Sequence, residues 1–431
     1  MVRFMEAIDR DRRVRVLVAH PSQQHSYQLA SALKLNDELG LYAPTVYDSP
    51  RSITRIVSQV LKGGLQRRAK GRRCENLEDS DVFQCCELLC LAKLFCMHVP
   101  FAKRFYLPIR YFTADRFAKK IAKLAIKEQF DAVITFDDTS PILFETLKKK
   151  APEIVRILDM SAASTLFMRD IYDKDINMQP AFASKLKKER SVVWNPVLVD
   201  RTSRELEAAQ YYLCASQFVV SSLEYSGIAP ENCFICRYGV DSEQFSFSKR
   251  FVEEGRPVRF VYVGGTKEFK GISYLLDAFM EIDARDATLT VVGENSLDTT
   301  LLQKYKGTIE FAGSIVHSDM PDELAKYDVM IFPSLGDGFG LAMTEGLASG
   351  LPVVGSKNSA APDLIRDGEE GCIIPIQSKE AIVHAVTYFV NNKEVIPTMS
   401  SKARKLAESM SWGGYYESVH RAIGKMLKGH E

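Results

Sequence analysis

Residues 257–265 read PVRFVYVGG, an apolar run rich in β-branched residues that ends on two glycines. A run of this kind predicts a strand buried inside a parallel sheet, followed by a tight loop. A helical pattern follows at about 272–280, and a second apolar run, ATLTVVG, occupies 287–293. Strand, helix and strand in this order are typical of a doubly wound α/β domain.

The alternation of strands and helices continues on both sides of this unit. Because a single core rarely grows beyond about 250–300 residues, the 431 residues of this chain predict two such α/β domains. Glycines and prolines gather at 226–256, which marks a linker. We place the domains at 1–238 and 239–410, with a final helix at 411–431. Further strands are predicted at 13–19, 131–136, 154–160, 308–312, 328–332 and 352–355.

The composition, with 46% hydrophobic and 26% charged residues, is that of a folded globular protein. The first twenty residues carry charge where a signal peptide would be apolar, so the chain is expected to stay in the cytosol. The apolar stretch 82–102 is interrupted by charged residues, which predicts a buried or interfacial helix rather than a membrane span. Nine scattered cysteines, with one CxxC pair at Cys233 and Cys236, are expected to pack as small hydrophobes.

The charge is distributed unevenly along the chain. Residues 51–127 hold 17 Lys and Arg against 6 Asp and Glu, although the whole chain carries only +1. This basic block mixes cations with aromatic and aliphatic residues, a pattern that suits an anionic membrane surface or a lipid-linked substrate. A solvated helix face and a nucleic-acid patch are the alternatives, and no recognition motif supports nucleic acid as a partner.

The stretch at 333–356, PSLGDGFGLAMTEGLASGLPVVGS, carries the most chemical information. A glycine-flanked loop follows a predicted strand and opens a helix near Leu341. Such a turn presents free backbone amides and the positive end of the helix dipole, which together bind anions. Asp337 in the loop and Glu345 in the helix can accept hydrogen bonds from two parts of one polyhydroxylated ligand.

These residues resemble the signature of glycosyltransferase family 4 (group 1): an acidic residue, GFGL, a glutamate eight positions on, and then GLASGLPVVGS. The resemblance covers about 240–427. It implies the GT-B fold, two Rossmann-like domains facing a cleft, and a reaction that retains the anomeric configuration. It also implies that the helix at 411–427 returns to the first domain.

The resemblance also assigns roles at the donor site. Asp337 would contact the donor sugar, Glu345 the nucleotide ribose, and Lys270, within VYVGGTKEFKG, the diphosphate. A cation and preorganised amides would stabilise the charge that develops on the leaving diphosphate. Further donor-binding residues are expected to be Gly264, Gly265, Lys267, Gly293, Val316, Gly338, Phe339, Gly340 and Leu341.

The chain departs from the family pattern at three positions. Asp337 stands where the family has Glu, Gly265 where many members have Arg, and Phe136 where a His is frequent. Lys267 is a candidate to compensate for the missing Arg. On the acceptor side, His20, Gln24 and His25 follow the first strand, and Asp137 and Asp138 follow the strand at 131–136. The two histidines can bind a ligand or shuttle a proton. Alternatively, one of them caps the following helix or packs, and Asp137 and Asp138 cap a helix after their strand.

Other motifs are given less weight. Asp9-x-Asp11 and Asp173-x-Asp175 match a metal-binding D-x-D, but we interpret both as surface charge. Neither a dinucleotide fingerprint nor a P-loop occurs. No metal and no cofactor are expected, because Lys270 and the helix dipole already supply positive charge.

The sequence thus predicts a hexosyltransferase that uses a UDP, GDP or dTDP sugar and an acceptor hydroxyl. The acceptor is predicted to be a lipid-linked saccharide at the cytoplasmic membrane face, as in surface-polysaccharide assembly. The alternatives are a transferase with a soluble acceptor and a degenerate GT-B protein that binds a nucleotide sugar or a partner without turnover.

Overall fold

The computed structural model describes residues 14–22, 25–50, 52–60, 62, 66, 69–137, 139 and 141–429. The chain divides into two compact units. One consists of the described residues of Met1–Met160, Asp200–Leu213 and Tyr416–Glu431, and the other of Ser161–Val199 and Cys214–Tyr415. In this division the segment Ser161–Val199 groups with the second unit and most of the last helix with the first.

The first sheet has the strand order β2-β1-β3-β4-β5-β6. Strand β1, VLVAH, is buried along its whole length, as expected of an apolar strand inside a parallel sheet. It runs parallel to β2 and β3, and β3 runs parallel to β4. The strands are β1 (Val16–His20), β2 (Leu39–Pro44), β3 (Ala132–Phe136), β4 (Val155–Met160), β5 (Tyr211–Cys214) and β6 (Cys233–Ile235).

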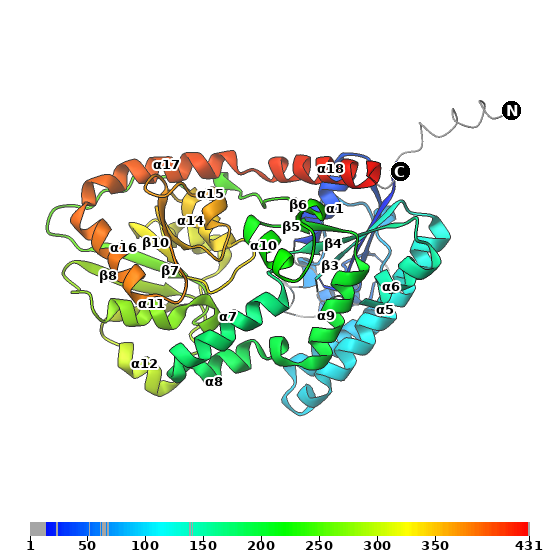
Figure 1. Ribbon diagram of the computed structural model, residues 1–431, viewed down its shortest axis with the longest axis horizontal. Helices are drawn as coiled ribbons and strands as arrows, with labels where there is room; N and C mark the ends of the chain where they lie inside the picture. Colours follow the sequence, from blue (N-terminus) through cyan, green and yellow to red (C-terminus); the bar gives the residue numbers. More distant parts are fainter. Residues whose placement is uncertain are drawn as a thin grey trace. The chain divides into compact units, whose positions relative to one another are not determined.

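The helices that alternate with these strands in the sequence pack on the sheet (Figure 1). The helix α5 is the longest of them, and its buried side chains, such as Phe117 and Ile121, recur at helical spacing. These helices are α1 (Ser26–Leu35), α2 (Ile53–Val60), α4 (Glu87–His98), α5 (Tyr106–Glu128), α6 (Pro141–Lys150), α9 (Pro196–Ala208) and α18 (Trp412–Lys428), with 3₁₀ turns η2 (Asp79–Asp81) and η3 (Pro100–Phe105).

The second sheet has the order β12-β11-β10-β7-β8-β9, and its neighbouring strands run parallel. The run that predicted a strand at 257–265 forms β7 at its centre. A single hydrophobic core, which includes Phe260, Leu275 and Phe389, packs beneath it. The strands are β7 (Val258–Val263), β8 (Ala287–Val292), β9 (Ile309–Gly313), β10 (Val329–Phe332), β11 (Val353–Ser356) and β12 (Gly371–Ile374).

The second unit also contains most of the shorter helices (Figure 1). These are α7 (Thr165–Met178), α8 (Pro180–Glu189), α10 (Gln217–Tyr225), α11 (Ile272–Phe279), α12 (Thr299–Tyr305), α13 (Met320–Leu324), α14 (Leu341–Ala348), α15 (Ala361–Leu364), α16 (Lys379–Asn391) and α17 (Ile396–Ser409). The 3₁₀ turns are η4 (Ser191–Trp194), η5 (Pro230–Asn232), η6 (Ser242–Gln244), η7 (Glu268–Lys270), η8 (His317–Asp319) and η9 (Lys393–Val395).

The predicted α/β class and each predicted strand are confirmed. Four strands, β2, β5, β6 and β12, were not anticipated. Strand β2, LGLYAP, contains a glycine and a proline, which weaken a strand pattern. It is stabilised instead by parallel pairing with β1, in which Val18 is the partner of Tyr42.

The apolar stretch 82–102 does not form one continuous helix, because α4 begins at Glu87 and a 3₁₀ turn follows it. Cys85, Cys90 and Cys96 are buried, which confirms that they pack as small hydrophobes. Among the described residues, no helix is both long and apolar enough to span a bilayer.

Candidate active site

The two central strands of the second sheet, β7 and β10, lie next to each other at the point where the strand order reverses. In open α/β sheets, ligands bind outside the carboxyl ends of the strands at such a reversal. Lys270 lies in the segment that follows β7, and Asp337 lies in the segment that follows β10. The fold therefore brings two predicted catalytic residues to the edge of the sheet where ligands bind.

Lys270 and Asp337 form an ion pair, and both side chains are half-buried. Their two loops pack closely against each other. A Cβ on Gly271, which has a φ of 72°, would lie 2.1 Å from the carbonyl oxygen of Pro333. The glycine permits this approach, which fixes a cation and a carboxylate side by side.

The loop that carries Asp337 is held by hydrogen bonds from several segments. The Asp337 amide donates to the Asn358 carbonyl (2.9 Å), and the Ser216 hydroxyl donates to the Gly338 carbonyl (2.6 Å). A Cβ on Gly338 would lie 1.9 Å from the Ser161 carbonyl oxygen. Position 338 therefore accommodates only glycine, and contacts with several segments hold the loop in place.

Helix α14 begins at Leu341, which confirms the predicted start of the helix. Its N-cap, Gly340, has a φ of 93° and provides no capping side chain. Within the described part of the chain, the amides of Leu341 and Ala342 have no hydrogen-bond acceptor. Phe339 is buried against the ring of Tyr238, 5.1 Å away between centroids. Free amides and the helix dipole here favour an anionic group.

Glu345 lies one turn inside α14. Burial raises the pKa of its carboxyl group, and the nearby His317 opposes this shift, with its Nδ1 3.9 Å from Glu345 Oε1. Val316, which is exposed, directly precedes His317. The structure thus brings the predicted ribose-binding glutamate close to the loop that contains Val316, another predicted donor-binding residue.

The ends of β7 and β8 meet through two glycines. Gly264 and Gly293 have φ values of 153° and 149°, and a Cβ on Gly293 would lie 2.2 Å from the Gly264 carbonyl oxygen. The Tyr262 hydroxyl donates to the carbonyl of Gly265 at 3.0 Å. These contacts shape the loop that leads to Lys270.

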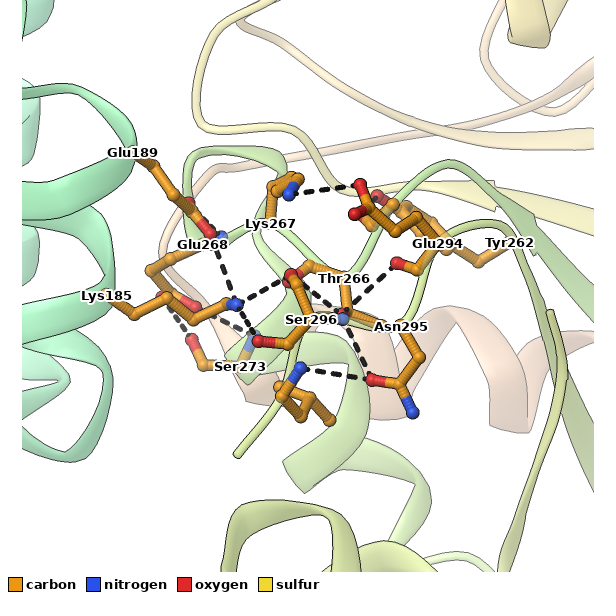
Figure 2. A network of polar contacts seen from close by, with 12 residues as sticks. Lys185, Glu189, Tyr262, Thr266, Lys267, Glu268, Ser273, Glu294, Asn295 and Ser296 are labelled. Carbon is orange, nitrogen blue, oxygen red and sulfur yellow. Dashed lines mark hydrogen bonds and ion pairs between the residues drawn. The ribbon is translucent and has the colours of Figure 1, made fainter. Parts of the chain in front are cut away.

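A polar network surrounds the same loop (Figure 2). Lys267 forms an ion pair with the exposed Glu294, with 3.4 Å between Nζ and Oε2. From α8, Lys185 donates to the hydroxyl of Ser296 at 2.8 Å, and Glu189 accepts from the amide of Glu268 at 2.7 Å. Sequence reasoning missed the α8 residues, because no motif connects that helix to the loop that leads to Lys270.

Glu268, between Lys267 and Lys270, is buried and accepts hydrogen bonds from the hydroxyl (2.5 Å) and amide of Ser273. It interacts with Asp175, which is also buried and accepts from the Tyr274 hydroxyl at 2.8 Å. Burial raises the pKa of both carboxyl groups, that of Glu268 well above its usual range. The interpretation of the Asp173-x-Asp175 motif as surface charge is therefore wrong for Asp175. Asp9 and Asp11 lie outside the described residues.

The paired carboxyl groups predict a pH dependence of stability. Because the folded state raises both pKa values, it retains protons that the unfolded chain releases. The contribution of these two groups to the free energy of unfolding is then largest in acid and is lost as pH rises through the raised pKa values. Glu268→Gln is expected to flatten this dependence, measured as Tm between pH 5 and pH 8. The control Glu294→Gln, at an exposed position, should keep the wild-type slope, and an unchanged slope in Glu268→Gln would contradict the assignment.

On the first sheet, the strand order reverses between β1 and β3. His20 at the end of β1 and Asp137 after β3 line one pocket of about 290 Å³. His20 is buried, and its Nδ1 accepts a hydrogen bond from the amide of Ser22 at 2.7 Å. Lys93 and Arg110 line the same pocket. Both residues belong to the basic block at 51–127 that was identified in the sequence, but the charge pattern of that block did not indicate a pocket.

His25 is directed elsewhere. Its Nε2 lies 2.9 Å from Oδ1 of Asp159, and both side chains are almost completely buried. The ring of Phe136, at the position where the family often has His, packs against the rings of His20 and His25. Gln24 and Asp138 lie outside the described residues.

Comparison with known proteins shows which class of protein this chain resembles. Residues 257–392 match the family model described as glycosyl transferases group 1. The crystal structure of HepE of Anabaena in complex with UDP has a TM-score of 0.57 and is 13% identical, covering 96% of this chain and 100% of that one. The fold is thus the GT-B type, with two Rossmann-like domains.

Curated relatives share a smaller part of their length. The chain is 30% identical over 213 residues to a GDP-mannose-dependent alpha-(1-6)-phosphatidylinositol dimannoside mannosyltransferase of Mycobacterium tuberculosis, covering 47% of this chain and 55% of the relative. It is 25% identical over 194 residues to an amylovoran biosynthesis glycosyltransferase of Erwinia amylovora, covering 42% and 47%. The chain spans about half the length of the curated relatives it matches. The similarity to group 1 glycosyltransferases therefore lies in part of the chain, which includes residues 257–392.

Proposed function

We propose that the protein transfers a hexosyl unit from a nucleoside diphosphate sugar to an acceptor hydroxyl, with retention of the anomeric configuration. The observation that carries this proposal is the Lys270–Asp337 pair, fixed beside the N-terminus of α14 at the strand-order reversal. A cation, a carboxylate and free amides at one sheet edge match the parts of a sugar diphosphate.

In the proposed reaction the bond between the sugar C1 and the diphosphate oxygen breaks. Lys270 and the amides of Leu341 and Ala342 stabilise the charge that develops on the leaving group. The acceptor hydroxyl then bonds to C1 from the same face and transfers its proton to an oxygen of the departing diphosphate. Asp337 orients the sugar hydroxyls, and Glu345 orients the ribose.

Thermal shift with UDP, GDP and dTDP tests donor binding. We expect one of them to raise Tm, because a ligand that binds only the folded state stabilises it. UDP is the first nucleotide to test, because the structurally similar HepE was solved in complex with it. GDP is the second, because a relative is named GDP-mannose-dependent. Absence of a shift with all three would refute every function that uses such a donor.

Turnover is predicted to need no added metal. Lys270 and the α14 amides provide positive charge where the diphosphate is proposed to bind. Release of free nucleoside diphosphate should therefore be unchanged after EDTA treatment and unaffected by added Mg²⁺ or Mn²⁺. A loss of activity in EDTA that Mg²⁺ restores would show that a metal takes part.

For the acceptor we propose a lipid-linked saccharide at the cytoplasmic membrane face, as in surface-polysaccharide assembly. The helices α4 and α5 and the turn between them expose large apolar side chains beside cations; Leu88 is 68% and Phe101 is 76% exposed. Exposed apolar and basic residues together favour an anionic bilayer surface. Sedimentation with phosphatidylglycerol vesicles, but not with phosphatidylcholine vesicles, is expected. Failure to sediment would favour a soluble acceptor.

A donor-binding protein without turnover is the second candidate, because Asp337 is one methylene shorter than the Glu of the family pattern. Asp337→Glu distinguishes the two functions. Donor binding without release of nucleoside diphosphate, in the wild type and in Asp337→Glu alike, would support the binding protein.

A further inference from the structure

The pocket at the strand-order reversal of the first sheet has two chemically different walls. The carboxyl ends of β1 and β3 provide one wall, with His20 and Asp137. The helices α4 and α5 provide the other, with Lys93, Tyr106 and Arg110. Its volume of about 290 Å³ is at the lower end of the range for small-molecule sites. It therefore fits a single compact polar group better than a long saccharide.

The helical wall has the chemistry of an anion site. Lys93 is half-buried and forms no ion pair with any residue that the structure describes. Arg110 adds a planar guanidinium from the neighbouring helix, and Tyr106, one turn before it, adds a hydroxyl. An ammonium, a guanidinium and a hydroxyl suit a phosphate, whose oxygens accept several charge-assisted hydrogen bonds.

The sheet-edge wall has a different chemistry. Nδ1 of His20 accepts the Ser22 amide, so the proton of the neutral ring is on Nε2. The carboxyl group of Asp137 lines the same side of the pocket. A carboxylate accepts hydrogen bonds from hydroxyl groups and repels phosphate, and a histidine donor also binds a hydroxyl oxygen. One ligand that carries a phosphate and a hydroxyl would satisfy both walls.

We propose that this pocket binds a phosphate group of the acceptor, so that the acceptor is a phosphorylated saccharide or alcohol. The proposal rests on the transferase function above, in which the donor diphosphate is held by Lys270 in the other unit. A free sugar phosphate and the phosphate of a lipid carrier share this chemistry.

Pyridoxal 5′-phosphate tests the proposal on the full chain, because it carries a phosphate and an aldehyde that forms an imine with a nearby lysine. After borohydride reduction, peptide mapping should find Lys93 modified well above Lys123, an exposed lysine further along α5. Inorganic phosphate and glucose 1-phosphate should protect Lys93, and glucose should not. Equal labelling of both lysines, or no protection by phosphate, would overturn the proposal.

Two variants locate the phosphate. Arg110→Gln and Tyr106→Phe should each weaken protection by phosphate, the first by about tenfold because a charge-assisted hydrogen bond is lost. Lys123→Gln, the matched control, should leave protection unchanged. If Arg110→Gln lowers Tm, its effect on protection could come from a destabilised fold. Tyr106→Phe removes only one hydroxyl group, so it then provides the test of the helical wall. Full protection in both variants would refute the assignment of the helical wall.

The source of the phosphate and the donor function are tested separately. Protection by phosphatidic acid vesicles but not by phosphatidylcholine vesicles would indicate a lipid phosphate, and protection by glucose 1-phosphate alone would indicate a free sugar phosphate. UDP should protect Lys270 and leave Lys93 reactive. If the donor function fails, protection of Lys270 by nucleotides disappears, while protection of Lys93 by phosphate persists.

Discussion

Replacement of Lys270 by alanine is expected to lower the rate of nucleoside diphosphate release by roughly 10²–10³-fold, the usual loss when one preorganised group that stabilises transition-state charge is removed. Lys270 is the cation that the fold fixes next to Asp337 at the end of β7. Because its positive charge acts mainly on the departing diphosphate, the turnover number should fall more than donor affinity. The measurement is steady-state release of UDP or GDP, with affinity from a separate titration.

Lys267→Ala is the matched control for this experiment. Lys267 lies three residues away on the same loop, but its ammonium is paired with the exposed Glu294. Because this ammonium is paired with Glu294 rather than with the proposed diphosphate, and because exposed ion pairs also contribute little to stability, we expect less than about a tenfold loss of rate in Lys267→Ala. Equal losses in the two variants would show that general positive charge, rather than the position of Lys270, supports the reaction. An equal loss would also support the hypothesis that Lys267 compensates for the arginine that the family pattern has at position 265.

The fold was largely predictable because parallel sheets are encoded by local, nearly continuous apolar runs such as 257–263 and 328–332. The proximity of the proposed donor-binding residues was predictable for a related reason. Lys270, Asp337 and Glu345 lie within short motifs, and the strand order brings those motifs to one sheet edge.

Contacts between distant segments were not predictable. The buried pairing of Asp175 with Glu268 joins α7 to the loop that carries Lys270, across 93 positions of sequence. Lys185 contacts Ser296 from α8. Each of these residues is ordinary in its local sequence, where a charged side chain usually indicates a solvated helix face. The same reason explains why Lys93 and Arg110 were assigned to a general basic block rather than to a pocket.

Replacement of Glu345 by glutamine is expected to weaken donor binding by roughly 10–100-fold, because the hydrogen bonds of a carboxylate to ribose hydroxyls contribute about 1.5–3 kcal/mol. Helix α14 holds Glu345 in place, so the variant should keep the wild-type Tm. The measurement is the Kd for UDP or GDP. An unchanged Kd would refute the ribose assignment.

The raised pKa of Glu345 adds a test that a purely structural role would not pass. Binding through the ionised carboxylate requires its proton to leave, so donor affinity should rise with pH through the raised pKa and fall in acid. That fall should begin at a higher pH than the ordinary glutamate pKa of about 4.3 would give. His317 lowers the pKa of Glu345, and its side chain is 67% exposed, so His317→Gln should move the loss of affinity to higher pH. In Glu345→Gln the Kd should be independent of pH over the same range, and a wild-type pH profile in that variant would show that another group controls donor binding.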